Sequence, residues 1–205
     1  MARIHKLGSE QPAKFGFKKA RTGSRPSSKD QAQLNLFSAA ASGRIVTLPT
    51  RLRPFEEALL LDERGSPAAA EAYERAIAEG DSVADAYCNL GIIRYHSGGV
   101  DEALHCFTQA ITSQPRHFET HYNLANLFFD RGELEASSVQ YGIAREIDDT
   151  YANLYFNLGL VNALLERYEP AHRALNTYRA LAPDDEGRAA DDLLESLRRT
   201  LIAAG

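Results

Sequence analysis

The feature that most constrains the fold is a 34-residue repeat in the middle of the chain. A shift of 34 residues aligns three similar tripeptides, Asn89-Leu90-Gly91, Asn123-Leu124-Ala125 and Asn157-Leu158-Gly159. A fixed period of this length is typical of solenoids, in which each unit is one supersecondary element packed against the next. The repeat therefore predicts stacked units rather than one globular core.

The same shift divides most of the chain into one divergent unit and three full units. The divergent unit is identified because Ala69, Tyr73 and Ala76 align with apolar residues of the unit that follows. Together the four units form a region over residues 50–185, divided into 50–83, 84–117, 118–151 and 152–185.

Each unit has the pattern of a helical hairpin. In the second unit, a helical stripe of apolar residues over 84–96 is broken at Gly98-Gly99, and a second helical stripe ends at Pro115. The small residues Gly91 and Ala103 would allow the two helices to approach closely. A hairpin cannot bury both of its faces alone, so the units must stack and the last one needs a cap.

The C-terminal residues 186–205 have the pattern of that cap. One face of a helix there would be apolar and the other charged, which suits a terminal helix with one side in water. The apolar face consists of Ala190, Leu193, Leu194, Leu197 and Leu201.

These repeats resemble the tetratricopeptide repeat family over about residues 50–185. The resemblance implies an all-α, right-handed solenoid of about four helical hairpins plus a C-terminal capping helix, here with an extended basic N-terminal arm. It also implies a protein-binding scaffold whose first helices line a concave groove. The sequence departs from the family pattern at Ala125, Ser137, Asp149 and Glu166.

The resemblance implies that first-helix positions facing away from each hairpin core form the partner-binding groove. An Asn amide at these positions could bind the backbone of a partner, or it could bond neighbouring helices. Aromatic residues there would be anchors if exposed, and core residues if not. The groove positions are Asn89, Ile92, Tyr95, Tyr122, Asn123, Asn126, Phe129, Phe156, Asn157 and Leu160.

Charge at the groove predicts the kind of ligand. Asp85, Glu119 and Asp130 stand at its edge, and none of the groove positions is Lys or Arg. The family's carboxylate-clamp mode grips an acidic tail through paired cations, which this groove lacks. An apolar or basic peptide segment is therefore the expected partner.

The N-terminal residues 1–30 form a basic arm with few large apolar groups, which predicts flexibility. They carry a net charge of +6, whereas the rest of the chain carries −11. We expect the arm to be a second attachment point or a regulator of the groove. Because its cations are interleaved with phenylalanines, nucleic acid or a ribosomal surface is an alternative partner. Its principal cations are Lys14, Lys18, Lys19, Arg21 and Arg25.

An apolar linker, residues 31–49, joins the arm to the repeats. Its two apolar clusters have no fold of their own, so we hypothesise that it docks on the solenoid or on a partner. The proposed docking residues are Leu34, Leu36, Phe37, Ile45, Val46 and Leu48.

No catalytic motif is evident, so the expectation is a non-enzymatic protein with no cofactor and no small-molecule substrate. His117 and His121 stand four residues apart, but no third ligand accompanies them, so no metal site is predicted. No stretch is apolar enough to cross a membrane, and the two cysteines suit a reducing compartment. A cytoplasmic location is expected.

The linker followed by repeats also resembles the C-terminal extension of some MerR-type transcription regulators. Their helix-turn-helix is missing, because residues 1–30 cannot form three packed helices. The resemblance therefore implies only a bacterial, cytoplasmic protein, and direct DNA readout is not supported.

Overall fold

The computed structural model describes residues 16–21, 52–182 and 190–204, with side chains of the last stretch described through Arg199. Within these residues every regular element is an α-helix, which confirms the predicted all-α solenoid. The helices are α1 (Pro54–Glu63), α2 (Ala69–Ala78), α3 (Val83–His96), α4 (Val100–Ser113), α5 (Phe118–Asp130), α6 (Leu134–Ile147), α7 (Ala152–Leu164), α8 (Tyr168–Leu181) and α9 (Asp191–Ala204).

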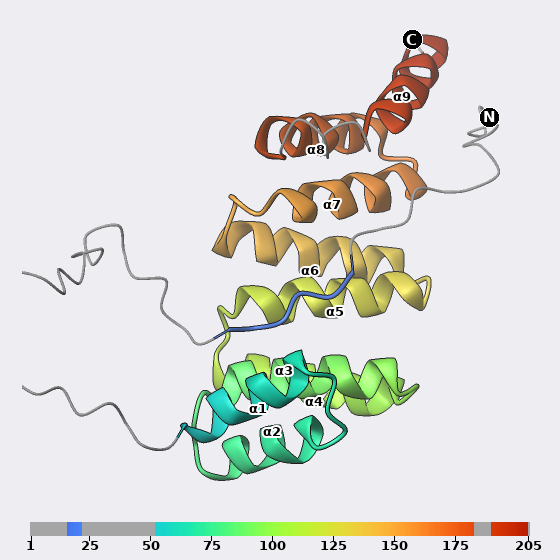
Figure 1. The fold of residues 1–205 in the computed structure, drawn as a ribbon. Helices are drawn as coiled ribbons and strands as arrows, with labels where there is room; N and C mark the ends of the chain where they lie inside the picture. Colours follow the sequence, from blue (N-terminus) through green and yellow to red (C-terminus); the bar gives the residue numbers. More distant parts are fainter. Residues whose placement is uncertain (1–15, 22–51, 183–189, 205) are drawn as a thin grey trace, which may run out of the picture.

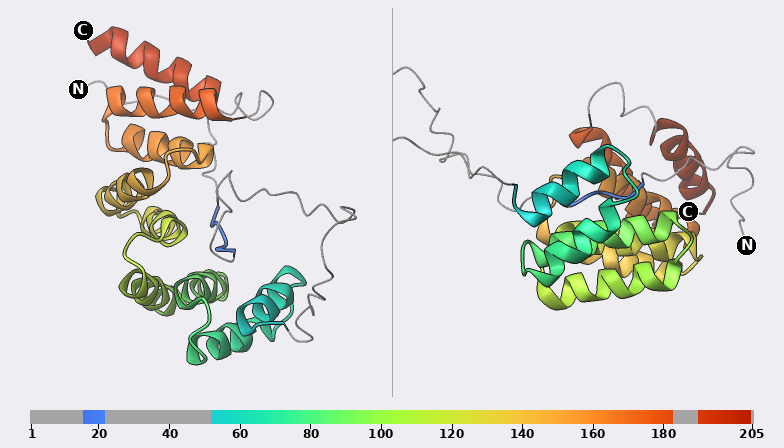
Figure 2. Two further views of the ribbon diagram at one scale, coloured as in Figure 1. Left: turned by 90° about the vertical axis from the view of Figure 1, so that its left-hand side faces the viewer. Right: turned by 60° about the horizontal axis from the view of Figure 1, so that its bottom comes forward.

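Successive helices pair as four antiparallel hairpins, α1–α2, α3–α4, α5–α6 and α7–α8, and each hairpin packs on the next (Figure 1). The capping helix α9 packs on α8. In the left view of Figure 2 the hairpins follow an arc, with residues 16–21 on its inner side. The solenoid thus has a concave side, which we call the groove.

In the second and fourth units, close approach of the two helices of the hairpin depends on glycine at one position. A Cβ atom added to Gly91 would lie 2.8 Å from Cε1 of Phe107, and one added to Gly159 would lie 2.7 Å from Cγ of Leu175. The third unit has Ala125 at the equivalent position, and the Ser137 hydroxyl opposite donates a hydrogen bond of 2.9 Å to its carbonyl oxygen. The departures from the family pattern at Ala125 and Ser137 therefore form one adapted contact.

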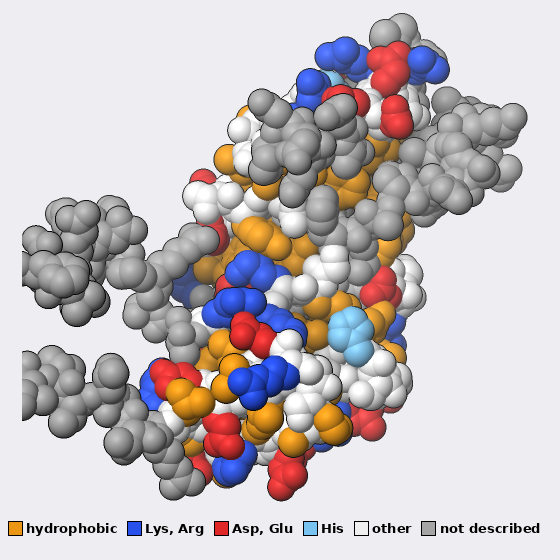
Figure 3. All heavy atoms as spheres, viewed as in Figure 1, with side chains coloured by type: hydrophobic (Ala, Val, Ile, Leu, Met, Phe, Trp, Pro, Cys, Tyr) orange, Lys and Arg blue, Asp and Glu red, His pale blue; other side chains and the backbone are white. Residues whose placement is uncertain are grey.

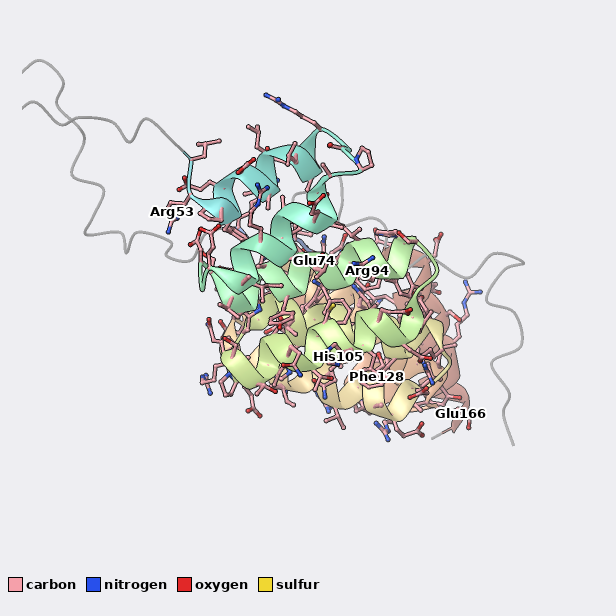
Figure 4. All side chains as sticks on the ribbon, turned by 90° about the horizontal axis from the view of Figure 1, so that it is seen from below. Arg53, Glu74, Arg94, His105, Phe128 and Glu166 are labelled. Carbon is pink, nitrogen blue, oxygen red and sulfur yellow. The ribbon has the colours of Figure 1, made fainter. Side chains whose placement is uncertain are left out.

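The turns within the hairpins require a left-handed backbone. Gly98 and Gly132 adopt φ angles of 85° and 75°, which glycine does at little cost. In the last hairpin this position is Glu166, with a φ angle of 57° (labelled in Figure 4). The side chain does not prevent the turn, although a non-glycine residue is uncommon in this region.

The buried side chains form three clusters along the solenoid, each shared by neighbouring units. The cap contributes Ala190, Leu193, Leu194 and Leu197 to the last of them. Neighbouring units are also linked on the surface, because Arg94 of α3 lies 2.5 Å from Glu74 of α2 (Figure 4). Among the described helices, none has the length and apolar character needed to span a membrane.

Two glycine substitutions should change stability in opposite directions. Gly159→Ala should lower the free energy of unfolding by about 1–3 kcal/mol, because the new methyl group would overlap a branched carbon of Leu175. Gly142→Ala, in α6, should raise it by about 0.5–1 kcal/mol, because nothing lies within 4 Å of the added Cβ and alanine favours the helix. Urea denaturation measures both. Equal effects of the two substitutions would contradict the close-packing explanation.

Candidate peptide-binding groove

Residues 16–21, which we call the N-terminal segment, cross the concave side of the solenoid in an extended conformation (blue in Figures 1 and 2). In the sequence Gly-Phe-Lys-Lys-Ala-Arg, alternate residues contact the first helices of the second and third units. The groove is therefore occupied by a part of the same chain that is more than thirty residues away from α1.

Two asparagine side chains hold the backbone of the N-terminal segment. Asn123 accepts a hydrogen bond from the Lys18 amide and donates one to the Lys18 carbonyl, both 2.7 Å long. Asn89 does the same for Ala20, at 2.7 and 2.8 Å. Because both the donor and the acceptor of each amide are used, these contacts fix an extended backbone with a two-residue spacing.

A third asparagine extends this row and sets the direction of the segment. Asn126 donates a hydrogen bond of 3.0 Å to the Gly16 carbonyl. Its own oxygen accepts from the Tyr141 hydroxyl and, at 3.1 Å, from Asn157. The segment therefore runs from the third unit towards the first, and Asn126 is oriented by groups behind it.

Phe17 fills an aromatic pocket at the second unit. Its ring centroid lies 4.6 Å from that of Tyr95, 5.7 Å from that of His96 and 6.3 Å from that of Phe107, which it stacks against. Such pairs add to the free energy gained from burial alone. Ala20, which is only 1% exposed, belongs to the same buried cluster.

All three cations of the segment meet carboxylates. Lys18 bonds Glu119 of α5, Lys19 lies 2.6 Å from Asp62 of α1, and Arg21 lies 3.3 Å from Glu63. Figure 3 shows Lys and Arg side chains intermixed with Asp and Glu in the middle of this face.

Lys18 also meets two aromatic rings. Its ammonium group lies 5.1 Å from the centre of the Phe118 ring and 5.3 Å from that of Tyr151. Both distances are within the range of cation–π attraction, so Lys18 is held by charge and by aromatic faces together.

Tyrosine hydroxyls around the groove are hydrogen-bonded and stay neutral. Burial, together with the hydrogen bond and negative charge of Asp130, raises the pKa of Tyr95 to about 12. The two side chains are 2.5 Å apart. Burial chiefly raises the pKa of Tyr73 as well, whose hydroxyl contacts Asn89 at 3.1 Å and Asp62 at 3.1 Å. The tyrosines therefore position the groove residues without introducing charge.

A cavity of about 1010 Å³ opens beside the segment. It is bounded by Phe17, Lys18, Lys19 and Arg21 of the segment, and by residues of the second and third units up to the turn before α7. The segment therefore leaves part of the groove open next to Lys18.

The structure separates the predicted groove residues into two groups. Asn89, Asn123 and Asn126 bond the segment, while Ile92 and Tyr95 pack in the cluster around Phe17. Four others lie in or against the core of the last two units, and Phe129 among them is only partly buried. These residues are Tyr122, Phe129, Phe156 and Leu160.

Asn157 bonds residues of the preceding unit. Its amide donates to the Tyr122 hydroxyl at 3.0 Å and to Asn126 at 3.1 Å, and these two contacts are of the helix-bonding kind. The two histidines have protein partners as well: His117 contacts Asp85 at 2.9 Å, and His121 contacts the Pro115 carbonyl at 2.9 Å.

Other predicted residues lie outside the described part of the chain. These are Lys14 and Arg25 of the arm, and Leu34, Leu36, Phe37, Ile45, Val46 and Leu48 of the linker. The described segment in the groove belongs to the basic arm and not to the linker for which docking was hypothesised.

Several groove contacts were not predicted. Asp62 and Glu63 end α1 of the divergent first unit, Phe118 begins α5 and Tyr151 directly precedes α7. A search of each repeat for the acidic or aromatic residues nearest its first helix would have found Phe118 and Tyr151. Neither position of the two acids is acidic throughout the repeats, because Asp62 aligns with His96, Asp130 and Leu164, and Glu63 with Ser97, Arg131 and Leu165.

Hydrogen exchange should show alternation along the segment. The amides of Lys18 and Ala20 donate to asparagine side chains, whereas within the described residues the Lys19 amide has no such acceptor. We expect Lys18 and Ala20 to exchange about fivefold more slowly than Lys19, from a net contribution of about 1 kcal/mol for each hydrogen bond. Asn89→Ala should abolish the protection of Ala20. Uniform exchange over the three amides would contradict the bound geometry.

Two family models match the chain. A model described as "Tetratricopeptide repeat" matches residues 57–99 and 91–142, and one described as "TPR repeat" matches residues 125–165. Together they cover residues 57–165, which is more than half of the chain. A search of curated proteins finds no match.

Solved structures share the fold at low sequence identity. The first tetratricopeptide domain of Spaghetti (RPAP3), bound to the HSP90 peptide SRMEEVD, is 20% identical with a TM-score of 0.54, over 58% of this chain and 93% of that one. MamA is 16% identical with a TM-score of 0.55, over 72% of this chain and 95% of that one. With its four stacked hairpins and the two matching models, the chain belongs to the tetratricopeptide repeat family.

Proposed function

We propose that this protein is a non-catalytic scaffold that binds an extended, basic polypeptide segment in its groove, and that its own N-terminal segment competes for the same site. The observation that carries the proposal is the pair of two-way hydrogen bonds from Asn89 and Asn123 to the backbone of Ala20 and Lys18. A groove that forms hydrogen bonds with every second peptide group is suited to any extended chain, including one from another protein.

The charge of the groove supports a basic partner. Asp62, Glu63 and Glu119 face the three cations of the N-terminal segment. The Spaghetti (RPAP3) domain holds a peptide that contains two consecutive glutamates. In this protein the glutamates of such a peptide would lie near the carboxylates of the groove. We therefore propose that this groove prefers basic peptides to acidic ones.

The covalent link between the N-terminal segment and the repeats explains why this segment would regulate the binding of a partner. Thirty residues separate Arg21 from Leu52, which makes rebinding of the segment intramolecular. Covalent linkage of a binding segment to its site gives effective concentrations on the order of millimolar for short linkers. A partner must outcompete that local concentration, and its apparent affinity falls by the fraction of grooves already occupied.

Attachment of this segment to nucleic acid has less support. Lys18, Lys19 and Arg21 are paired with carboxylates, and Phe17 is packed among aromatic side chains. The segment would have to leave the groove before its cations could bind phosphates or its phenylalanine could stack on a base.

A peptide that copies residues 14–23 tests the proposal by fluorescence anisotropy. The receptor is the full chain with Phe17→Ser and Ala20→Arg, which we call the open-arm variant. Serine removes the aromatic anchor, and an arginine cannot fit where Ala20 is 1% exposed. We expect the peptide to bind the open-arm variant about tenfold more tightly than the wild type, because the competing segment is released.

Asn123→Ala in the open-arm variant should then weaken binding about tenfold or more, because two backbone hydrogen bonds of roughly 1 kcal/mol each are lost. Asn162→Ala is the matched control: this buried asparagine donates only to the Leu158 carbonyl of its own helix, at 2.8 Å. Equal peptide affinity for the wild type and the open-arm variant would refute competition, and equal effects of the two alanine substitutions would refute the groove assignment.

A further inference from the structure

We infer that the groove selects its partner by side-chain sequence, and that the partner segment has the order aromatic, lysine, cation, small residue, read from the third unit towards the first. This inference rests on the proposed function, because it names the class of partner for the same site. The N-terminal segment, with Phe17, Lys18, Lys19 and Ala20, serves as the template.

The aromatic position is specified by shape. Phe17 is surrounded by rings on three sides, those of Tyr95, His96 and Phe107, at centroid distances of 4.6–6.3 Å. A flat apolar side chain can contact all three rings, whereas an aliphatic residue would lose the ring-to-ring geometry. Phe17 is partly buried against this cluster, and aromatic residues are among those that commonly dominate affinity at contact surfaces.

The lysine position is specified by charge and by two rings at once. The ammonium group of Lys18 contacts Glu119 and lies 5.1 and 5.3 Å from the rings of Phe118 and Tyr151. A neutral side chain would lose both attractions and leave Glu119 without its partner. An acidic side chain would be repelled.

The small position is specified by lack of space. Ala20 is 1% exposed, and both polar groups of its backbone are held by Asn89. It shares a buried cluster with Cys88, Ile92 and Leu124. A larger side chain would have to push the backbone away from Asn89, so only a small residue is compatible with the hydrogen bonds.

The two remaining cations should matter less, and in a definite order. Asp62, which meets Lys19 at 2.6 Å, has a side chain only 11% exposed. Arg21 is 70% exposed where it meets Glu63 at 3.3 Å, and exposed ion pairs contribute little. The cation after the lysine should therefore count for more than the one after the small residue.

Variant peptides bound to the open-arm variant test the aromatic, lysine and small positions against the exposed cation Arg21. Each peptide copies residues 14–23 and carries one substitution: Phe17→Ala, Lys18→Ala, Ala20→Leu or Arg21→Ala. We expect the first three to bind about tenfold more weakly or worse, and Arg21→Ala to change affinity by less than about twofold. A scrambled peptide of the same composition measures the contribution of net charge alone and should bind at least about tenfold more weakly.

A receptor substitution separates direct recognition of the lysine from a general charge effect. In the open-arm variant with Glu119→Gln, the penalty for Lys18→Ala in the peptide should shrink to less than about threefold, while the penalty for Phe17→Ala stays unchanged. Circular dichroism of each receptor variant confirms that the helices remain folded.

The outcomes distinguish this inference from the function on which it rests. If all peptides, including the scrambled one, bind equally, the groove binds basic chains without reading their sequence, and the inference is overturned while the scaffold function stands. If no peptide binds, both fail. The molecular mass of the protein in solution gives a further outcome. If that mass rises with protein concentration for the wild type but not for the open-arm variant, the partner is a second copy of this chain, and the assignment to a separate protein is overturned.

Discussion

The close approach of the two helices within each hairpin is the constraint on which the rest of the structure depends. At Gly91 and Gly159 even one methyl group would lie within 3 Å of the opposite helix. This spacing makes the hairpins similar enough to stack with the same geometry. Stacking in turn aligns Asn89 of α3 with Asn123 of α5, so that their amides can hold alternate peptide groups of one extended chain.

The groove shows how a polar row can be buried in a helical solenoid. Asn89, Asn123 and Asn126 are fully buried, and an unpaired amide at such a position would be costly. The Tyr73 and Tyr141 hydroxyls bond Asn89 and Asn126 from behind, and the N-terminal segment satisfies the groups that face the groove. The occupied groove thus meets hydrogen-bonding demands that an empty one would have to meet with water.

The fold could be predicted from the sequence because its signal repeats. The period of 34 residues, the glycine and alanine positions and the apolar face of the cap are each local patterns, and α3 to α8 follow them. The site was less predictable. Asn157 has a sequence context similar to that of Asn123, yet two of its contacts are to Tyr122 and Asn126 of the preceding unit, a pairing that the repeat spacing does not specify.

Tyr122 and Phe156 show the same limit, since an aromatic residue on a first helix can face either the groove or the next hairpin, and both are buried between hairpins. The sequence by itself determined the repeat, the hairpins, the small-residue contacts and the opposite charges of the arm and the body, because these depend on residues near one another or at a fixed spacing. Only the tertiary structure decided that Gly16–Arg21 lies in the groove and which acids meet its cations, because those contacts join residues 42 to 110 positions apart. Their pairing depends on the curvature of the stacked units, which no local pattern encodes.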